Sequence, residues 1–547
     1  MTSSDESYDA VVVGAGIGGL VCASYLAVAG LRVLVAERHT VAGGNGQVFR
    51  RRGRYEFDVG VHYLGDCGPG GVIPAILAGL GADGRVAFLP LEPDGFDRVL
   101  LPGLTVDVPV GWDRYLDRLT AALPAEAPGI TRCVRTLEAL AAALRGRSLS
   151  SAAPSRSDVD LLRTGAGSLA GLFAACGLSA RAGTLLAAQS GNYGAPPSGT
   201  SATAHAAMID HYLRGAYYPA GGGQLLPATL VEVIEAHGGE VRTRCPVRRV
   251  TTGGGRATGV VLDDGTAVRA PVVVSNADYR HTVLELCADA ALPRPLVDRT
   301  RDATMRAAAA VLYVALDRPL DIPNANLWWW RDADAEAAYR ALGTGEPPMA
   351  FLSFASVKDP GARAVCPPGH ANFQVMTLVP PAPPGPPDYR RDPGYLAAKD
   401  RLTAELLDIA EELLGPLRAH VVHLETATAR TNRRFTGGSG GTPFGLGDWG
   451  GVHRRPDVRT SVDGLYVAGQ DTRYGSGIVG AAVSGITAAG RVLGRDLLPE
   501  VHAGAVLGDP ARLPARGAAF DPLQVSRGSR RTRGARATAA VGGPGTV

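Results

Sequence analysis

A glycine-rich turn between two short apolar stretches constrains the fold of this chain more than any other feature. Residues 8–13 are apolar and rich in valine, which predicts a buried parallel strand, and a turn of sequence GAGIGG occupies residues 14–19. Residues 20–29 favour a helix, and residues 32–36 predict a second buried strand that ends at Glu37. A strand, a glycine-rich turn, a helix and a second strand form the unit that binds a dinucleotide. We therefore expect an α/β protein with a Rossmann-like parallel sheet.

The residue types within this unit explain how it would hold a dinucleotide. Gly14 permits the tight turn, Gly16 lets the backbone approach a pyrophosphate, and Gly19 lets the helix lie close to the strand. The phosphates then meet free N–H groups at the positive end of the helix. Glu37 can accept hydrogen bonds from ribose hydroxyls, and its charge disfavours the 2′-phosphate of NADP. The predicted binding residues of this unit are Gly14, Gly16, Ile17, Gly18, Gly19 and Glu37.

The stretch after the acid narrows the choice of cofactor. Arg38, Gly43 and Gly44 lie just beyond Glu37, and residues 55–65 then have the sequence YEFDVGVHYLG. In these residues the chain resembles the flavoprotein family of phytoene desaturases, carotenoid isomerases and retinol saturases. The resemblance implies FAD, with the second glycine pair beside its pyrophosphate and ribityl chain and the later segment near its flavin ring. It adds a further set to the predicted FAD-binding residues: Arg38, Gly43, Gly44, Gly60, Val61 and His62.

A second glycine-rich motif near the other end of the chain repeats the opening device. Residues 464–469 read as a turn, a strand and a glycine, and the sequence GSGIVGAA then opens a helix whose N-terminus can stabilise negative charge. The resemblance implies that Asp471 reaches the ribityl and phosphate region and that the helix start meets the flavin. The form of this motif most resembles the retinol saturase branch. Its predicted FAD-binding residues are Gly469, Asp471, Gly477, Ile478 and Val479.

The middle of the chain contains one more stretch that resembles this family. A YYPAGGG sequence precedes a helix, and a VVVSNAD sequence ends a later strand. The resemblance implies that the strand around Val247 lies against the adenine end of the FAD and that glycines 221–223 come near the flavin. These glycines also suit a helix start that needs unusual backbone angles, and the two interpretations can hold together.

Length and patterning predict how the chain divides. At 547 residues it exceeds one ordinary domain, and its hydrophobic fraction of 46% is enough for sizeable cores. We expect a Rossmann-like FAD-binding domain of the glutathione-reductase and amine-oxidase type, with an inserted α+β substrate domain. The expected FAD-binding segments are residues 8–68, 215–280 and 457–500, and the expected substrate segments are residues 69–214 and 281–456. Residues 501–547, rich in alanine, glycine, proline and arginine, are expected to be disordered.

Composition excludes several other classes of protein. The net charge of +3 gives no case for a nucleic-acid partner, and seven cysteines without a C-x-x-C pair argue against a metal site and for a reducing compartment. The polar start is unlike a signal peptide, and no stretch has the roughly eighteen apolar residues of a membrane span. The near absence of lysine suggests a bacterial origin. We expect a cytoplasmic protein, with peripheral membrane contact as an open alternative.

Three consecutive tryptophans stand out in the second half of the chain. Trp328, Trp329 and Trp330 could form a wall for a hydrophobic substrate or a patch that enters a membrane interface. Packing within a core is the equally weighted alternative.

The resemblance implies redox chemistry at a C–C or C=C bond of a hydrophobic polyene or isoprenoid-like molecule. His62 is the first candidate for a proton donor or acceptor, because histidine titrates near neutrality; Tyr63 and Tyr474 follow. Three alternatives remain: a redox-neutral cis–trans isomerase, an amine oxidase, and a non-catalytic protein that binds prenyl groups. An amine oxidase with cysteine-linked flavin is disfavoured, since no cysteine follows Cys366. The external electron partner and the oligomeric state stay open.

Overall fold

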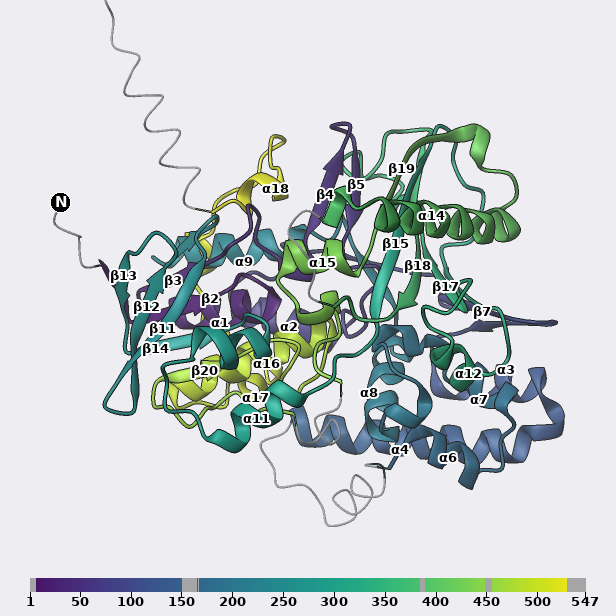
Figure 1. The fold of residues 1–547 in the computed structure, drawn as a ribbon, viewed down its shortest axis with the longest axis horizontal. Helices are drawn as coiled ribbons and strands as arrows, with labels where there is room; N and C mark the ends of the chain where they lie inside the picture. Colours follow the sequence, from purple (N-terminus) through teal and green to yellow (C-terminus); the bar gives the residue numbers. More distant parts are fainter. Residues whose placement is uncertain (1–5, 150–164, 166, 384–388, 448–454, 529–547) are drawn as a thin grey trace, which may run out of the picture.

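The computed structural model describes residues 6–149, 165, 167–383, 389–447 and 455–528. Two lobes lie side by side in Figure 1, each built around its own sheet. The first and last parts of the chain meet in the left-hand lobe, and the middle of the chain builds most of the right-hand lobe. The glycine-rich motifs at the two ends of the sequence therefore belong to one lobe.

The first lobe contains a five-stranded sheet whose strands are all parallel. Its order is β10 (Glu240–Arg242), β3 (Val33–Ala36), β2 (Ala10–Val13), β14 (Val272–Ser275) and β20 (Leu465–Val467). Strands β2 and β3 are buried along their whole length, as valine-rich strands of a parallel sheet should be. One face of the sheet shares a core with helices α1 (Ile17–Val28), α2 (Val72–Gly79), α9 (Leu225–Ala236), α16 (Gly477–Leu493) and α17 (Leu497–His502).

The other face of this sheet is covered by a smaller sheet. Its order is β1 (Glu6–Ser7), β13 (Ala267–Arg269), β12 (Arg256–Leu262) and β11 (Val247–Gly253). Apolar side chains of both sheets form one core, which includes Val11, Leu34, Val260 and Val273. The first lobe thus has three layers, and the carboxyl ends of β2 and β20 deliver both glycine-rich turns to the same edge.

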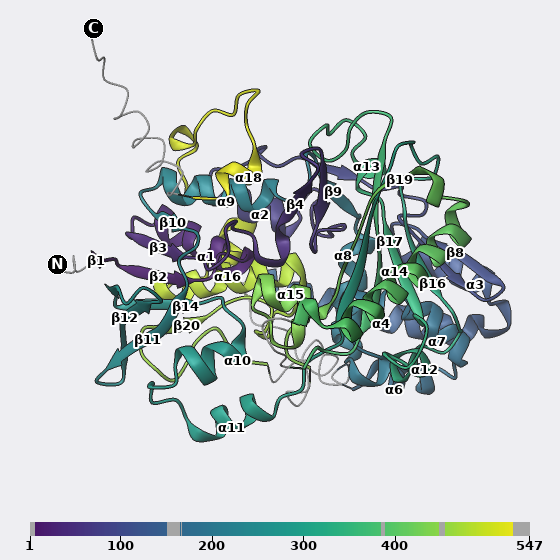
Figure 2. The same cartoon turned by 45° about the horizontal axis from the view of Figure 1, so that its top comes forward.

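The second lobe is organised by a seven-stranded mixed sheet. Its order is β19 (Val421–Ala427), β15 (Ala308–Leu316), β18 (Ala371–Val379), β17 (Met349–Ser353), β16 (Asn326–Trp330), β7 (Asp97–Leu101) and β8 (Leu104–Val108). One face shares a core with helices α3 (Trp112–Ala122), α4 (Ala127–Leu149), α6 (Leu169–Ala175), α7 (Ala180–Leu186) and α8 (Ala202–Leu213). Helix α14 (Pro393–Leu414) covers the opposite face (Figure 2).

The three tryptophans lie in strand β16 and are all buried. Trp328 and Trp330 point to the face covered by α3–α8, and Trp329 points to the face covered by α14. The alternation follows from the two-residue period of a strand. A membrane patch formed by these residues is therefore wrong, because none of the three is exposed.

The lobes divide the chain at places that differ from the expected boundaries. Helix α2 lies in the core of the first lobe, so that lobe continues past residue 68. Hairpin β4 (Val48–Arg51) and β5 (Tyr55–Asp58) instead sends Tyr55 and Phe57 into the core of the second lobe. Residues 281–302 stay against the first lobe, where Val283 shares a small core with Val467. The local pattern of apolar residues gives no sign of which core they join.

The expectation of disorder beyond residue 500 is wrong for residues 501–528. Helix α18 (Pro522–Val525) follows a segment in which the Arg516 guanidinium donates to Glu232 and Thr229, at 2.7 and 2.6 Å. Ser526 is completely buried and accepts hydrogen bonds from Ala42 and Gln224. These hydrogen bonds, together with Val501 and Leu513 in the core of the first lobe, hold the segment in place although its sequence has no regular apolar period. Residues 529–547 lie outside the described residues.

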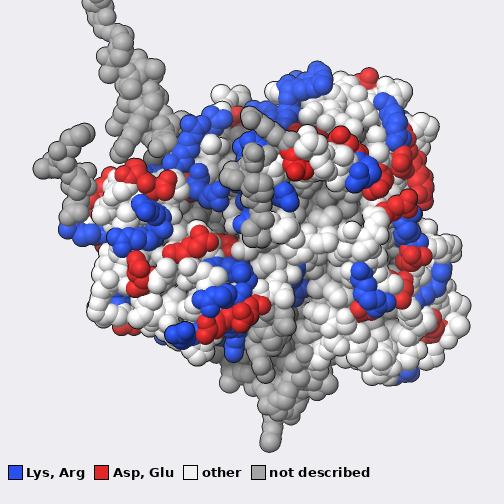
Figure 3. Space-filling model, viewed as in Figure 1, with Lys and Arg blue, Asp and Glu red and all other residues white. Residues whose placement is uncertain are grey.

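The surface carries charges of both signs. On the face shown in Figure 3, lysine and arginine side chains are interspersed with aspartate and glutamate. This mixture agrees with the small net charge of +3. No helix among the described residues is long and apolar enough to cross a bilayer.

Candidate active site

A cavity of about 1020 Å³ extends between the two lobes. Its first end is lined by both glycine-rich motifs and by the loop that contains Gly43 and Gly44. Its second end is lined by side chains of α8 and of strands β15, β16, β17 and β18. We call these parts the dinucleotide end and the substrate end. The cavity is continuous, so groups bound at the two ends can meet.

Two loops touch at the dinucleotide end without side chains between them. Gly14 has a positive φ of 94°, which a glycine adopts without strain. Gly43 donates a hydrogen bond from its N–H to the carbonyl of Ala15 at 2.7 Å. A Cβ atom added at Gly44 would lie 3.0 Å from the Cα of Gly16. The second glycine pair therefore closes over the first, and Gly14, Gly16, Ile17, Gly18, Gly43 and Gly44 all line the cavity.

Glu37 stands at the outer part of this end. Its carboxylate accepts hydrogen bonds from the N–H groups of Ala15, at 2.8 Å, and His39, at 2.6 Å. A carboxylate has about four acceptor sites, so sites remain for ribose hydroxyls. Arg38 and Val247 line the cavity beside it. Val247, which is expected near the adenine, thus lies at the same end of the cavity as Glu37, which is expected near the ribose.

The start of helix α16 opens into the cavity. Its N-cap residue, Ser476, makes no side-chain cap hydrogen bond, so the first N–H groups of the helix have no such partner. Gly477, Ile478 and Val479 line the cavity, as do Gly469 and Asp471. Free N–H groups at a helix start favour a negatively charged or electron-rich group.

Asp471 also ties this motif to its surroundings. Its carboxylate accepts hydrogen bonds from the N–H groups of Leu446, at 2.8 Å, and Tyr279, at 3.2 Å. Burial, with a further contribution from the charge of Asp278, raises the pKa of Asp471 to about 6. The residue therefore fixes two neighbouring segments and also forms part of the cavity wall.

The residues at this end fit an FAD. Helices α1 and α16 both present their N-termini there, as the two charged or electron-rich parts of the cofactor require. Two buried polar atoms in the cavity wall, Asn45 Oδ1 and His62 Nδ1, have no hydrogen-bond partner among the described residues. Such atoms are costly unless a ligand or water satisfies them.

Some predicted cofactor residues do not line the cavity. A Cβ at Gly19 would lie 2.3 Å from the carbonyl oxygen of Gly14, so Gly19 serves close packing behind the turn. Val61 lies in the apolar core of the first lobe, although Gly60 and His62 on either side line the cavity.

Glycines 221–223 are not among the residues that line the cavity, and their backbone contacts lie elsewhere. The N–H of Gly221 donates to Asp359 at 2.6 Å, and that of Gly223 donates to Asp58 at 3.1 Å. Gly221 and Gly222 have φ values of 87° and 95°. A helix start with unusual backbone angles accounts for them.

His62 lines the cavity but is a poor proton donor. Burial, and then the charge of Lys358, lower the pKa of His62 to about 3. The imidazole is therefore neutral at physiological pH, and the reason for ranking it first, titration near neutrality, does not hold. The backbone carbonyl of His62 accepts a hydrogen bond from Lys358 Nζ at 2.6 Å. Tyr474, the third candidate, lines the cavity beside the start of α16.

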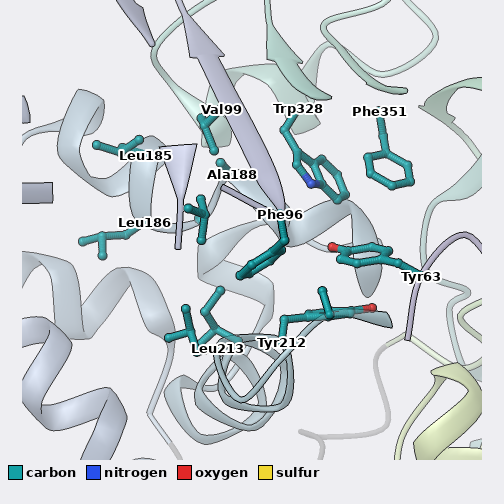
Figure 4. Close-up of a cluster of buried hydrophobic side chains, with 14 of the residues drawn as sticks. Tyr63, Phe96, Val99, Leu185, Leu186, Ala188, Tyr212, Leu213, Trp328 and Phe351 are labelled. Atoms are coloured by element: carbon teal, nitrogen blue, oxygen red, sulfur yellow. The ribbon is translucent and has the colours of Figure 1, made fainter. Parts of the chain in front are cut away.

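Tyr63 stands at the substrate end within a cluster of aromatic side chains (Figure 4). Its ring is stacked on Tyr212 with a centroid distance of 4.1 Å, and Phe351 lies on its other side at 5.8 Å. The hydroxyl of Tyr63 donates to Asp97 Oδ2 at 3.1 Å and accepts from Asn192 Nδ2 at 2.9 Å. Tyr63 is therefore a cavity tyrosine with a defined hydrogen-bond network.

Sequence reasoning missed Asp97, the completely buried acid of this network. It opens strand β7, where Asp97, Val99 and Leu101 share the buried phase of the alternation. An aspartate at a strand position that alternation predicts to be buried could have indicated a functional residue. Burying a carboxylate is costly unless it has a function or several hydrogen-bond donors.

The rest of the substrate end combines adaptable apolar side chains with charged ones that include Arg145, Asp210 and Arg214. Three of the five methionines of the chain line it, together with large apolar side chains: Met208, Met349, Met376, Val311, Trp328, Phe351, Leu378 and Phe444. Methionine is flexible and fills irregular spaces, so such a wall suits an elongated hydrophobic molecule. No group of three or more His, Cys, Asp or Glu side chains that could hold a metal ion is found among the described residues.

Comparison with known families decides the class of protein. The family model described as flavin-containing amine oxidoreductase matches residues 17–493. The chain belongs to this family. It is an FAD-dependent oxidoreductase, and the match runs from within the first glycine-rich turn through the whole substrate lobe to the second glycine-rich motif.

Individual relatives agree with this assignment. The chain is 27% identical over 538 residues to all-trans-retinol 13,14-reductase of Macaca fascicularis, covering 91% of this chain and 87% of the relative. It is 26% identical over 524 residues to the chloroplastic prolycopene isomerase of Arabidopsis thaliana, covering 89% and 83%. The crystal structure of an oxidoreductase from Methanosarcina mazei has a TM-score of 0.62 at 19% identity, over 87% of this chain and 99% of that one. The last likeness shows the fold alone.

Proposed function

We propose that this flavoenzyme adds or removes a pair of hydrogens at a C–C or C=C bond of a hydrophobic polyene. The observation that carries the proposal is the continuous cavity, whose FAD-compatible end opens into the methionine-rich substrate end. The names of the relatives support the substrate class, since one is a retinol reductase and the other an isomerase of a carotenoid.

We assign the dinucleotide end to FAD on the placement of its residues. Gly14, Gly16, Ile17 and Gly18 would hold the pyrophosphate at the start of α1, with Gly43 and Gly44 closing over it. Glu37 would accept the ribose hydroxyls, with Arg38 and Val247 beside the adenine. Asp471 and Gly469 would lie along the ribityl chain, and Gly477, Ile478 and Val479 would face the flavin. When bound there, FAD supplies the centre that takes or gives a hydride.

The residues of the substrate end would hold the polyene and exclude water. Trp328, Phe351 and Met376 offer apolar surface without a fixed polar partner for the ligand. A neutral His62 beside them adds no charge to this wall. The substrate would therefore be selected by length and shape more than by charge.

The test is the mass of the product. The purified protein is reduced anaerobically and incubated with all-trans-retinol or with an acyclic carotene. The products are separated by chromatography, and their molecular masses are measured by mass spectrometry. A gain of two hydrogens supports saturation. A loss of two hydrogens with oxidised enzyme supports desaturation. Recovery of unchanged polyene in every arm, with flavin bound, would contradict the proposal.

A redox-neutral isomerase is the second candidate, and the observation that favours it is the isomerase relative, whose coverage is nearly as large. In that case the polyene would keep its mass and change its retention and absorption spectrum. The same experiment therefore separates the two candidates.

A further inference from the structure

We propose that Tyr63 carries the proton of this reaction and that the buried carboxylate of Asp97 is the positioning residue that holds and receives it. The inference rests on the proposed function, because transfer of two hydrogens at adjacent carbons needs one site for a hydride and one for a proton. Tyr63 is the group that meets the substrate, and Asp97 acts through it.

The ring of Tyr63 is held in one orientation. Tyr212 is stacked against it with an interplanar angle of 13°, and Phe351 covers the opposite side, so the ring has little freedom to tilt (Figure 4). A fixed ring fixes the position of its hydroxyl, which is what proton transfer to a bound substrate requires. Tyr63 is among the residues that line the cavity, so a ligand bound there lies against it.

Asp97 and Asn192 take two of the three hydrogen-bonding positions of the Tyr63 hydroxyl. A phenol oxygen has one hydrogen and two lone pairs. Asp97 Oδ2 accepts the hydrogen at 3.1 Å, and Asn192 Nδ2 donates to one lone pair at 2.9 Å. A side-chain hydrogen bond also joins the hydroxyls of Tyr63 and Tyr212, so a substrate C–H group meets the second lone pair by displacing that contact.

Asp97 is built to take a proton from Tyr63. It is completely buried, and its carboxylate accepts from Gln189 Nε2 at 2.8 Å and from Asn326 Nδ2 at 2.9 Å. These amides orient the carboxylate but bring no positive charge. Burial raises the pKa of Asp97, so the acid is a better proton acceptor than an exposed aspartate.

Few charged groups face this pair. The Lys358 ammonium lies 6.0 Å from the centre of the Tyr63 ring and acts on Asp97, while Asp58 is its other acidic neighbour. Burial lowers the pKa of Lys358 to about 7. His62 is neutral, and Tyr212 keeps its proton because burial raises its pKa. Asp97 is thus the acceptor that is hydrogen-bonded to Tyr63.

The step balances in both directions. As a double bond forms, a C–H bond breaks and its proton passes to the Tyr63 oxygen, while the proton of Tyr63 passes to Asp97. The electron pair of that bond becomes the new C=C bond, and the adjacent carbon loses a hydride, for which a bound FAD would be the acceptor. In saturation the same atoms move back, and Asp97 restores the proton of Tyr63.

Two variants and a matched control test the assignment. In Tyr63→Phe and Asp97→Asn, the rate of a single turnover with polyene should fall at least about 100-fold, within the range for loss of a general acid–base group. Flavin content and polyene affinity should stay within threefold of wild type. The double variant should lose little more, because the two residues act as one unit.

Tyr218→Phe is the control. The Tyr218 hydroxyl donates to the buried Asp58 carboxylate at 2.6 Å, so this variant also removes a phenol–carboxylate hydrogen bond, but Tyr218 is absent from the cavity lining. It should keep its turnover rate. A rate for Asp97→Asn close to that of wild type, or an equal loss in Tyr218→Phe, would overturn the assignment.

A substrate-free measurement separates this proposal from the proposed function. With carbon-13 in the tyrosine rings, the signal that disappears in Tyr63→Phe belongs to Tyr63. In Asp97→Asn this signal should titrate at lower pH than in wild type, since the aspartate charge opposes ionisation of the phenol. Identical titrations would overturn the pairing of the two residues. If the wild-type enzyme does not react with polyenes, but the Tyr63 signal titrates at lower pH in Asp97→Asn than in wild type, only the proposed function is contradicted.

Discussion

The two ends of the cavity are built from different parts of the polypeptide. The dinucleotide end is mostly backbone: two helix starts and two glycine turns that touch, as Gly44 and Gly16 do. The substrate end is made of side chains from α8 and four strands of the second lobe. A backbone site tolerates no added side chain, whereas a side-chain site can change its shape and keep the fold. Cofactor binding and substrate binding should therefore respond differently to substitution.

The largest effect is expected from a side chain added at the dinucleotide end. In Gly44→Val, the new Cβ would lie 3.0 Å from Gly16 Cα, and the positive φ of 59° adds strain. Overpacking of this kind costs about 3 kcal/mol, which corresponds to roughly 100-fold weaker FAD binding. FAD content and affinity are measured by flavin absorbance and fluorescence.

The matched control for this substitution is Gly30→Val. Gly30 has a φ of 89°, but an added Cβ there has no atom within 4 Å. It should lose stability and still retain FAD. Equal FAD loss in both variants would mean that backbone strain, and not the contact between the two loops, governs binding.

The next effect concerns the C-terminal segment that braces the cofactor loop from behind. Ser526 accepts from the N–H of Ala42 at 2.8 Å, while Gln224 donates to Ala42 and to Ser526 Oγ, at 2.9 and 2.8 Å. A chain that ends after Gly504 should bind FAD about tenfold more weakly, because an unsatisfied buried N–H costs about 1–3 kcal/mol. A chain that ends after Gly528 is the control. Equal FAD affinity in the two chains would show that the segment is dispensable.

A substitution at the substrate end should separate substrate binding from cofactor binding. Phe351→Ala removes a ring that contacts Tyr63 and Trp328. Such a truncation costs about 3–5 kcal/mol of unfolding free energy. We expect roughly tenfold weaker polyene binding by absorbance titration, a loss of about 1.4 kcal/mol, with an unchanged flavin spectrum.

Phe373→Ala is the comparison variant for Phe351. Phe373 is just as buried but lies in the core on the α14 face of the sheet, outside the cavity lining. It should lose similar stability and keep its polyene affinity. Weaker polyene binding in both variants would mean that general loosening of the lobe explains the effect.

The smallest functional effect is expected at His62. His62→Gln should change the turnover rate less than about threefold. A histidine that stays neutral at working pH does not supply the rate enhancement of a general acid–base group. Stability should show the difference instead. The pKa of His62 is lowered to about 3 in the folded protein. Its ordinary value is about 6.5, so the wild type loses stability as pH falls through this window, by up to about 1.4 kcal/mol per pH unit.

The check is chemical unfolding at several pH values between these two limits. The wild type should lose stability on acidification more steeply than His62→Gln, whose side chain does not titrate. Parallel curves would show that His62 is not buried in its neutral form.

The sequence predicted the two ends of this cavity unequally, and the reason is physical. Gly14, Gly16, Glu37 and the start of α16 were predictable because a dinucleotide site depends on local backbone geometry, which short motifs encode. Asp97 was not, because its function depends on Tyr63 and Asn192, which come from other parts of the chain. The contact of Ser526 with the cofactor loop could not be predicted either, because a single buried polar contact produces no periodic pattern in the sequence.

One measurement tests most directly the claim that a single cavity brings flavin and polyene together. The purified enzyme is reduced anaerobically until its flavin absorbance bleaches, and polyene is then added in a stopped-flow spectrometer. The account predicts that the oxidised flavin spectrum returns at the rate at which the polyene spectrum changes. A flavin that stays bleached while the bound polyene remains unchanged would contradict it.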